Sequence, residues 1–256
     1  MDDSRFMTPI RFRIERMLPE LVKNYAPQEP SVLDLGCGRG MYSQLFVQYP
    51  SFSYVGIDLK ERKEWKTFQS KNITYQAADA THVPYPDEHF NFAIAITSLE
   101  HIKDEKGAMR ELFRLVKKGS YVVIIVPTKP YWLFQLGRHC FHHNSKKQLY
   151  QLVQTQSFEI IEYEKVGGIL SFLFTCFDIW LSQAILLPLW LYRKIRKKPL
   201  TSEEMDHILE KTVHWYINFT WSNAIYRAFL QCIDQFDLIF RILPNHHSIV
   251  LKKENL

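Results

Sequence analysis

Residues 32–40, Val-Leu-Asp-Leu-Gly-Cys-Gly-Arg-Gly, constrain the fold more than any other part of this chain. They hold three of its nine glycines, so glycine is scarce elsewhere and concentrated in this segment. Glycine permits tight turns and lets a second group lie against the bare backbone. The apolar residues before the turn predict a buried parallel strand, and residues 41–49 predict the helix that follows. A strand, a glycine-rich turn and a helix N-terminus together are typical of a nucleotide-binding element.

The glycine spacing separates this loop from two common phosphate-binding loops. A dinucleotide fingerprint needs a glycine where the chain has Met41, and a P-loop needs a Gly-Lys-Ser or Gly-Lys-Thr ending, which the loop lacks. Residues 34–40 instead have the Asp-x-Gly-x-Gly-x-Gly form of class I S-adenosylmethionine-dependent methyltransferases, and the chain resembles that family. The alternative is a plain tight turn. The resemblance implies an S-adenosylmethionine cofactor whose methionine arm passes over a loop containing Asp34, Gly36, Cys37, Gly38 and Gly40.

The second predicted strand, residues 52–59, ends in an acidic residue. Asp58 lies twenty positions after Gly38, where a nucleotide-binding fold places a carboxylate that accepts hydrogen bonds from ribose hydroxyls. The resemblance adds Leu59 to this part of the cofactor site. Alternatively, Asp58 only caps a helix predicted over residues 60–69.

A third strand is predicted over residues 73–76. In the family, the acidic residue of the following loop contacts the adenine amino group, and the next backbone amide faces the ring. The resemblance implies these roles for Asp79 and Ala80. Residues 83–92 also resemble the segment that leads into the family's fourth strand, with Asn91 at the usual place of an aspartate.

The fourth predicted strand, residues 92–96, is followed by Thr-Ser-Leu-Glu-His-Ile over residues 97–102. Ligands of open α/β sheets lie outside the carboxyl ends of the strands, so we expect this segment, with Thr97, to face the methyl group and the acceptor. His101 can take a proton from the acceptor, and Glu100 can do the same or orient His101. The alternative is that His101 packs beneath the cofactor, because many members of the family catalyse by positioning alone.

Four further elements complete the expected fold. Residues 105–117 predict a helix closed by Gly119, residues 121–126 a central parallel strand, residues 157–161 a sixth strand, and residues 247–252 an antiparallel last strand. The resemblance therefore implies an α/β, Rossmann-like fold. We expect a seven-stranded, mostly parallel sheet with an antiparallel last strand and helices on both faces.

The length of the chain fits a single methyltransferase domain. We expect an N-terminal helical lid over residues 1–29, a Rossmann-like core over residues 30–166 and 246–254, and a hydrophobic helical insertion over residues 167–245. The lid is inferred from one apolar helical face, formed by Ile10, Ile14, Met17, Leu21 and Tyr25. The four cysteines are widely spaced, which predicts reduced thiols in a cytoplasmic protein rather than a disulfide framework or a zinc site.

The insertion contains the least family-like stretch. Eighteen of the 24 residues over 169–192 are apolar or aromatic, counting cysteine, and five of the six residues over 193–198 are basic. A single membrane crossing would put the last strand on the opposite side from the cofactor loop, and Asp178 and Pro188 also disfavour it. We expect an interfacial or re-entrant segment at the cytoplasmic face of a membrane, with the basic run on anionic lipid. A helical cap over an apolar acceptor pocket is the alternative, and the two can coexist.

A second apolar stripe follows in the same insertion. Ile225, Phe229, Ile233, Phe236 and Phe240 are spaced four, four, three and four positions apart, so they share one face of a predicted helix. The basic run contributes much of the net charge of +5. This charge does not indicate a nucleic-acid partner, because the aromatic residues cluster with aliphatic ones instead of interleaving with basic ones.

These features predict an enzyme that methylates a small or lipid-like acceptor, such as a lipid, a quinone precursor or a lipid-linked sugar. The cofactor carries the difficult chemistry in such a reaction. Two other functions stay open. An NAD-binding oxidoreductase is disfavoured by Met41 and by the lack of a Tyr-x-x-x-Lys dyad. A non-catalytic, membrane-docked regulator would use the same fold.

Overall fold

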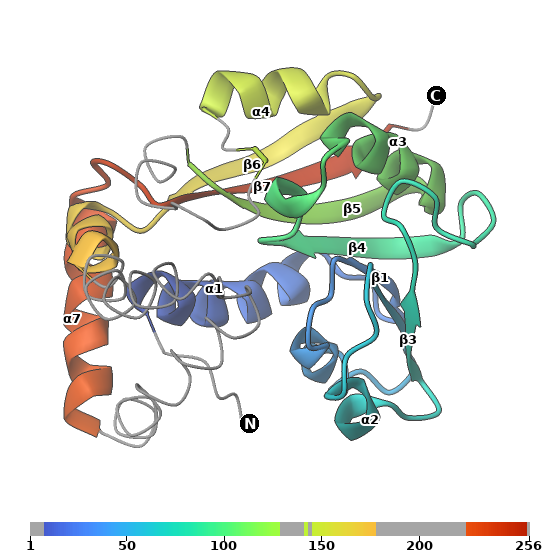
Figure 1. Ribbon diagram of the computed structural model, residues 1–256, viewed down its shortest axis with the longest axis horizontal. Helices are drawn as coiled ribbons and strands as arrows, with labels where there is room; N and C mark the ends of the chain where they lie inside the picture. Colours follow the sequence, from blue (N-terminus) through green and yellow to red (C-terminus); the bar gives the residue numbers. More distant parts are fainter. Residues whose placement is uncertain (1–7, 129–140, 143–144, 178–223, 255–256) are drawn as a thin grey trace, which may run out of the picture. The chain divides into compact units, whose positions relative to one another are not determined.

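A computed structural model of the 256-residue chain describes residues 8–128, 141–142, 145–177 and 224–254 (Figure 1). The chain divides into two compact units. The core unit comprises Arg16–Val166 and His246–Leu256, and the helical unit comprises Met1–Glu15 and Gly167–Asn245. The functional division into lid, core and insertion stays a prediction.

The core unit is built on a seven-stranded sheet with the order β3-β2-β1-β4-β5-β7-β6. The strands are β1 (Ser31–Leu35), β2 (Ser53–Asp58), β3 (Ile73–Ala77), β4 (Phe90–Ile96), β5 (Val116–Pro127), β6 (Phe158–Val166) and β7 (His246–Lys253). Every pair from β3 to β5 is parallel, whereas β7 runs antiparallel to both β5 and β6. This arrangement confirms the predicted Rossmann-like sheet and its antiparallel last strand.

Helices cover both faces of the sheet, as predicted. The helices that contribute to the core unit are α1 (Pro9–Tyr25, shared with the helical unit), α2 (Trp65–Phe68), α3 (Glu105–Leu115) and α4 (Lys146–Val153), with the 3-10 helices η1 (Met41–Leu45) and η2 (Leu99–His101). Figure 1 shows α3 on one face of the sheet. Its Met109 lies in the same buried cluster as Val122 of β5. On the other face, the ring of Tyr25 lies 5.2 Å from that of Tyr121. Tyr121 and Val122 are neighbours in a strand, so their side chains point to opposite faces.

The helix predicted over residues 41–49 is wrong in length and type, because only the 3-10 helix η1 forms there. The hydroxyl of Ser43 donates to the carbonyl of Gly40 at 2.8 Å, a local bond that competes with α-helical pairing. The hydroxyl of Tyr75 donates to the same carbonyl at 2.7 Å and holds the start of the segment against β3. Tertiary contacts therefore override the helical pattern of these residues.

Two other helix boundaries also differ from the prediction. The helix expected over residues 60–69 is reduced to α2, and Gln69 is already extended. Helix α3 ends at Leu115 because Val116 begins β5 and pairs with Phe90 of β4. Gly119 consequently lies within β5 and does not close the helix, so that expectation is wrong.

The helical unit contains α7 (Ala224–Ile239) and a helical segment over residues 169–177. The carboxylate of Asp237 accepts hydrogen bonds from the backbone amides of Leu170 and Ser171, at 3.0 and 2.9 Å, and thus caps that segment. Of the predicted stripe along α7, Ile233 is buried, whereas Phe229 is 49% exposed. The long apolar stretch from residue 178 onward and the basic run over 193–198 lie outside the described residues. In the part of the chain that the structure describes, no helix has the length and apolar character of a membrane span.

Candidate cofactor and active site

The loop after β1 is tied to the ends of two neighbouring strands. The backbone amides of Gly36 and Cys37 both donate to the carbonyl of Ile57 in β2, at 2.8 and 2.9 Å. On the other side, the Ser98 hydroxyl donates to the Leu35 carbonyl at 2.6 Å. The sheet therefore gathers the predicted loop and the segment after β4 at the carboxyl ends of β1, β2 and β4, where open α/β sheets bind ligands.

Asp58 connects the end of β2 to the glycine-rich loop. Its Oδ2 accepts a hydrogen bond from the amide of Gly38 at 3.0 Å, and its Oδ1 accepts one from the amide of Lys60 at 3.3 Å. The guanidinium of Arg62 lies 3.8 Å from Oδ1. Because α2 begins only at Trp65, the alternative that Asp58 serves as the cap of a helix over residues 60–69 is wrong. The contact of this carboxylate with a ribose stays a prediction.

Two glycines of the loop differ in their surroundings. At Gly38 the backbone has a φ of +53°, and a Cβ placed there would meet no atom within 4 Å. At Gly40 a Cβ would lie 2.5 Å from the ring of Tyr75, which stacks on Trp65 at a centroid distance of 5.4 Å. The indole N–H of Trp65 donates to the Gly38 carbonyl at 2.8 Å. The loop is thus packed against aromatic rings at Gly40 and leaves bare backbone at Gly38, which fits a ligand that lies close to the main chain.

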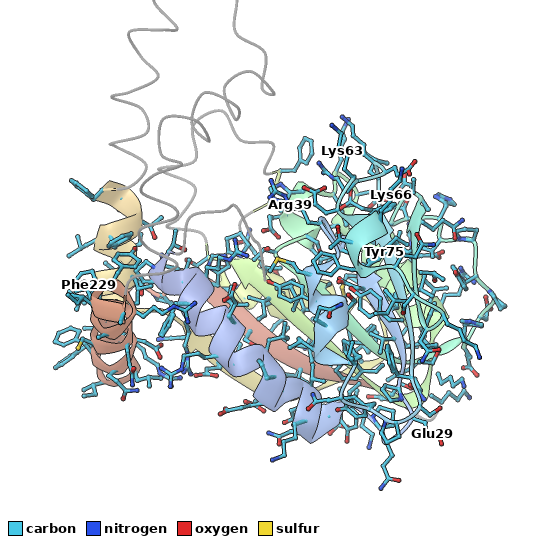
Figure 2. The ribbon with its side chains drawn as sticks, turned by 90° about the horizontal axis from the view of Figure 1, so that it is seen from below. Glu29, Arg39, Lys63, Lys66, Tyr75 and Phe229 are labelled. Atoms are coloured by element: carbon cyan, nitrogen blue, oxygen red, sulfur yellow. The ribbon has the colours of Figure 1, made fainter. Side chains whose placement is uncertain are left out.

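Figure 2 shows where the carboxyl edge of the sheet lies within the core unit. Arg39 and Tyr75 lie near Lys63 and Lys66, at the opposite end of the unit from Glu29. Glu29 precedes β1 and Arg39 follows it. The guanidinium of Arg39 lies 3.2 Å from the carboxylate of Glu64.

Asp34 is buried beneath the loop, where its carboxylate accepts a hydrogen bond from the Tyr54 hydroxyl. Burial raises the pKa of Asp34 to about 7, although the Tyr54 hydrogen bond acts in the opposite direction. Burial, together with Asp34 and Asp58, raises the pKa of the Cys37 thiol, so it is not a reactive thiolate. The burial of Asp34 supports a role in shaping the loop, and its contact with the methionine arm stays a prediction.

The predicted adenine-binding residues follow β3. The amide of Ala78 donates to the carbonyl of Asp58 at 2.9 Å, which places the start of this segment beside the end of β2. The Oδ1 of Asp79 accepts hydrogen bonds from the amide and hydroxyl of Thr81, both at 2.8 Å, and these bonds lower the pKa of Asp79. Ala80 is half-buried, whereas Leu59 is 71% exposed. The carboxylate of Asp79 and the side chain of Leu59 are accessible to a nucleoside at this edge.

Thr97, directly after β4, has a backbone conformation that its residue type disfavours. Its φ is 49°, and its amide donates to the Ile125 carbonyl at 2.7 Å. A positive φ is rare for a β-branched residue, because the side chain crowds the neighbouring carbonyl. Strained residues of this kind cluster at functional sites. The position supports the predicted place of Thr97 beside the cofactor.

Glu100 and His101 lie in η2, which follows Thr97. The Glu100 side chain is buried, its pKa is raised by burial to about 8, and its Oε2 has no hydrogen-bond partner among the described residues. The Nε2 of His101 lies 3.9 Å from Oε1 of Glu100, beyond hydrogen-bond distance, and the imidazole is about half exposed. Glu100 is therefore a neutral acid near pH 7, and it can donate a hydrogen bond or a proton. Which of the two groups exchanges a proton with an acceptor stays a prediction.

Four residues that shape this edge were not singled out from the sequence. Ser98 bonds to the end of β1, Tyr54 bonds to Asp34, and Tyr75 and Trp65 pack against the loop. Alternation within the second predicted strand could have placed Tyr54 on the same face of the sheet as Gly56, because the two lie two positions apart. Tyr75 lies beside Gly56 only through the pairing of β2 with β3. The sequence offers no comparable signal for Trp65.

Comparison with known proteins bears on the family and the fold of the chain. A family model described as a methyltransferase domain matches residues 9–163. Over 103 residues, the chain is 37% identical to a tRNA (carboxymethyluridine(34)-5-O)-methyltransferase of Arabidopsis thaliana, covering 39% of this chain and 24% of that protein. It is 33% identical to a demethylmenaquinone methyltransferase of Streptomyces griseus over 109 residues, covering 40% of this chain and 44% of that protein.

The chain thus spans less than half the length of either relative, and their acceptors are properties of those proteins. Among solved structures, the YcgJ protein of Bacillus shares the fold. Its TM-score is 0.56 at 15% sequence identity, with 94% of this chain and all of that chain covered.

Proposed function

Because this chain belongs to the class I S-adenosylmethionine-dependent methyltransferases, we propose that it transfers a methyl group to a small or lipid-like acceptor. When bound, the cofactor supplies an electrophilic methyl carbon on its sulfonium. The chain's own task is to hold the cofactor, align the acceptor, exclude water and manage a proton.

The observation that carries this proposal is the arrangement of Asp58 beside the bare backbone of Gly38. A carboxylate at the end of β2 and an unobstructed loop suit a ribose and the chain attached to it. Asp79, Ala80 and Leu59 would bind the adenine side of the cofactor. Residues 34–40 would hold the methionine arm, and Thr97 would lie beneath the transferred methyl group.

His101 is the proposed group that takes the acceptor's proton, and Glu100 is the proposed hydrogen-bond donor beside it. An acceptor hydroxyl or amine loses a proton when it is methylated, and a half-exposed imidazole can receive that proton. Neutral, buried Glu100 would act by donating a hydrogen bond to the acceptor or to His101 when the site is filled. The other proposed role for His101, packing beneath the cofactor without proton transfer, predicts that its replacement changes cofactor affinity more than turnover.

The acceptor side is assigned to the helical insertion. Its strongly apolar sequence over residues 169–192 suits a lipid, a quinone precursor or a lipid-linked sugar, and one relative is a demethylmenaquinone methyltransferase. We assign residues 1–29 to a lid over the cofactor site and residues 193–198 to anionic lipid at the cytoplasmic face of a membrane.

Cofactor binding and methyl transfer can be tested separately. Titration calorimetry with S-adenosylmethionine should show binding to the full chain, and Asp58→Asn should weaken it about tenfold or more, the loss expected of a charge-assisted hydrogen bond. Glu61→Gln, an exposed carboxylate three positions further along, is the matched control and should bind normally. Incubation with a radiolabelled methyl donor and a lipid extract should then label an extractable product.

The outcomes separate the competing functions. Binding of NADH in preference to S-adenosylmethionine would refute the assignment of the site. Binding of S-adenosylmethionine with no label in any fraction would favour a non-catalytic regulator. Equal affinity in the Asp58→Asn variant would remove the carboxylate from the cofactor site.

A further inference from the structure

Helix α7 directs its acidic side chains inward. Asp234 and Asp237 are 4% and 2% exposed, respectively. The guanidinium of Arg13 lies 3.6 Å from the carboxylate of Asp234, and Asp237 caps the helical segment over 169–177. These contacts fix the rotation of α7, because a buried carboxylate without such partners would cost several kcal/mol.

The opposite side of α7 is apolar and exposed. We call Phe229, Phe236, Ile239 and Phe240 the phenylalanine face; their exposed fractions are 49%, 40%, 76% and 44%. Figure 2 shows Phe229 projecting outward from the helix. The ring centroids of Phe236 and Phe240 lie 4.6 Å apart, so the two rings form a continuous apolar surface. Exposed clusters of large apolar side chains mark interaction sites.

Charge indicates what kind of surface would cover this face. All of Ala224–Ile239 is described, and its exposed residues include Arg227 but no acid. In the sequence, the basic run over residues 193–198, with five Lys or Arg residues, precedes α7. An exposed apolar and aromatic face without negative charge, in a chain that also carries a basic run, is complementary to a bilayer interface with anionic headgroups.

We propose that the phenylalanine face of α7 docks on the surface of an anionic lipid bilayer. The inference deepens the proposed function, because a lipid-like acceptor would be reached from that surface. Aromatic rings bury in the interfacial region, and inward-facing Asp234 and Asp237 add no negative charge that would repel the headgroups.

The test is flotation of the full chain with unilamellar vesicles of phosphatidylcholine, with and without phosphatidylserine. The wild type should float with the anionic vesicles. Combined Phe229→Gln, Phe236→Gln and Phe240→Gln substitutions should weaken partitioning at least about tenfold, since each ring loses apolar area that the bilayer would bury. Val47→Gln, which removes a 54% exposed apolar side chain from the core unit, should leave partitioning unchanged.

Equal flotation of the triple variant and the wild type would overturn the proposal. It would also be overturned if the wild type failed to bind vesicles and formed a dimer by light scattering that the triple variant did not form, because the face would then bind a second copy. Calorimetry with S-adenosylmethionine on the same variants keeps the proposed function separate. Failure of methyl-donor binding would appear there, whereas failure of docking would appear only in flotation.

Discussion

The core unit and the helical unit differ in where they place some carboxylates and large apolar side chains. In the core unit, apolar residues of the strands are buried, and carboxylates gather at the carboxyl edge, as at Asp58 and Glu100. In the helical unit, α7 buries Asp234 and Asp237 and exposes Phe229. Hydrophobic periodicity therefore identifies an element in both units, but the partners available to its polar groups decide which side faces inward.

The largest loss of stability is expected in the glycine-rich loop of the core unit, which is tightly packed at Gly40. Gly40→Ala would place a methyl group 2.5 Å from the Tyr75 ring at a φ of +81°. We expect the free energy of unfolding to fall by about 3 kcal/mol, from overpacking and from backbone strain together. Gly38→Ala meets no neighbour within 4 Å and should cost about 1 kcal/mol, the strain alone.

Urea denaturation of the two variants provides the measurement. Because the open backbone at Gly38 is proposed to face the cofactor, Gly38→Ala should weaken S-adenosylmethionine binding more than its small stability cost suggests. Similar stability losses for both variants would show that Tyr75 moves aside and that the loop is less tightly packed than the structure indicates.

The inward acids of α7 give the next largest effect. Asp237→Ala removes the acceptor of two backbone amides, those of Leu170 and Ser171, and should cost about 2–3 kcal/mol. Gln235→Ala, an exposed substitution on the same helix, should change stability by less than about 0.5 kcal/mol. Thermal unfolding compares the two. If Asp237→Ala were as stable as Gln235→Ala, the buried carboxylate would not fix the orientation of α7.

Much of the core unit could be predicted from the sequence, because its signals are local. A buried apolar strand leads into a glycine-rich turn at β1, an apolar strand ends in an acidic residue at β2, and neighbouring parallel strands must bring their carboxyl ends together. The segment after the loop could not be predicted, because the Tyr75 contact with Gly40 comes from a distant strand. The end of α3 was missed for the same reason, since Val116 pairs with Phe90 in the sheet.

The residues of the candidate site could be predicted from the sequence, but their backbone conformation and burial could not. Nothing in the local sequence indicates that Thr97 adopts a positive φ or that Glu100 is buried without a hydrogen-bond partner among the described residues. Both states depend on the packing of several elements. The same limit applies to α7, where the spacing of the phenylalanines predicts a face but not its exposure.

Glu100 provides an effect of a different kind, which depends on pH. Burial raises its pKa from an ordinary value of 4.5 to about 8, so the folded protein binds a proton that the unfolded chain has released. The free energy of unfolding should therefore fall as the pH rises from about 4.5 to about 8. Glu100→Gln lacks this titration, so its free energy of unfolding should exceed that of the wild type by about 4 kcal/mol at pH 8, relative to their difference at pH 4.5.

Denaturation curves recorded across this pH range measure the difference. Asp34, whose pKa is raised to about 7, titrates in both proteins and cancels in the comparison. Parallel curves for the wild type and Glu100→Gln would show that Glu100 ionises normally in the folded protein. The proposed hydrogen-bond donor near pH 7 would then be lost.

The smallest effect on stability is expected at Phe229, which is next to Leu230 in the sequence but lies on the exposed side of α7. Phe229→Gln should change the free energy of unfolding by less than about 0.5 kcal/mol, because the ring is already 49% exposed. Leu230→Gln should cost about 3 kcal/mol, because that side chain is fully buried with Tyr226 and packs with Phe12 and Phe174. Urea denaturation measures both.

A large loss of stability from Phe229→Gln would mean that the ring contributes to the fold, and a face needed for folding would not be available for lipid. A near-zero change, together with loss of vesicle flotation in the triple variant, would assign the phenylalanine face to binding alone, in contrast to the buried apolar residues of the core unit.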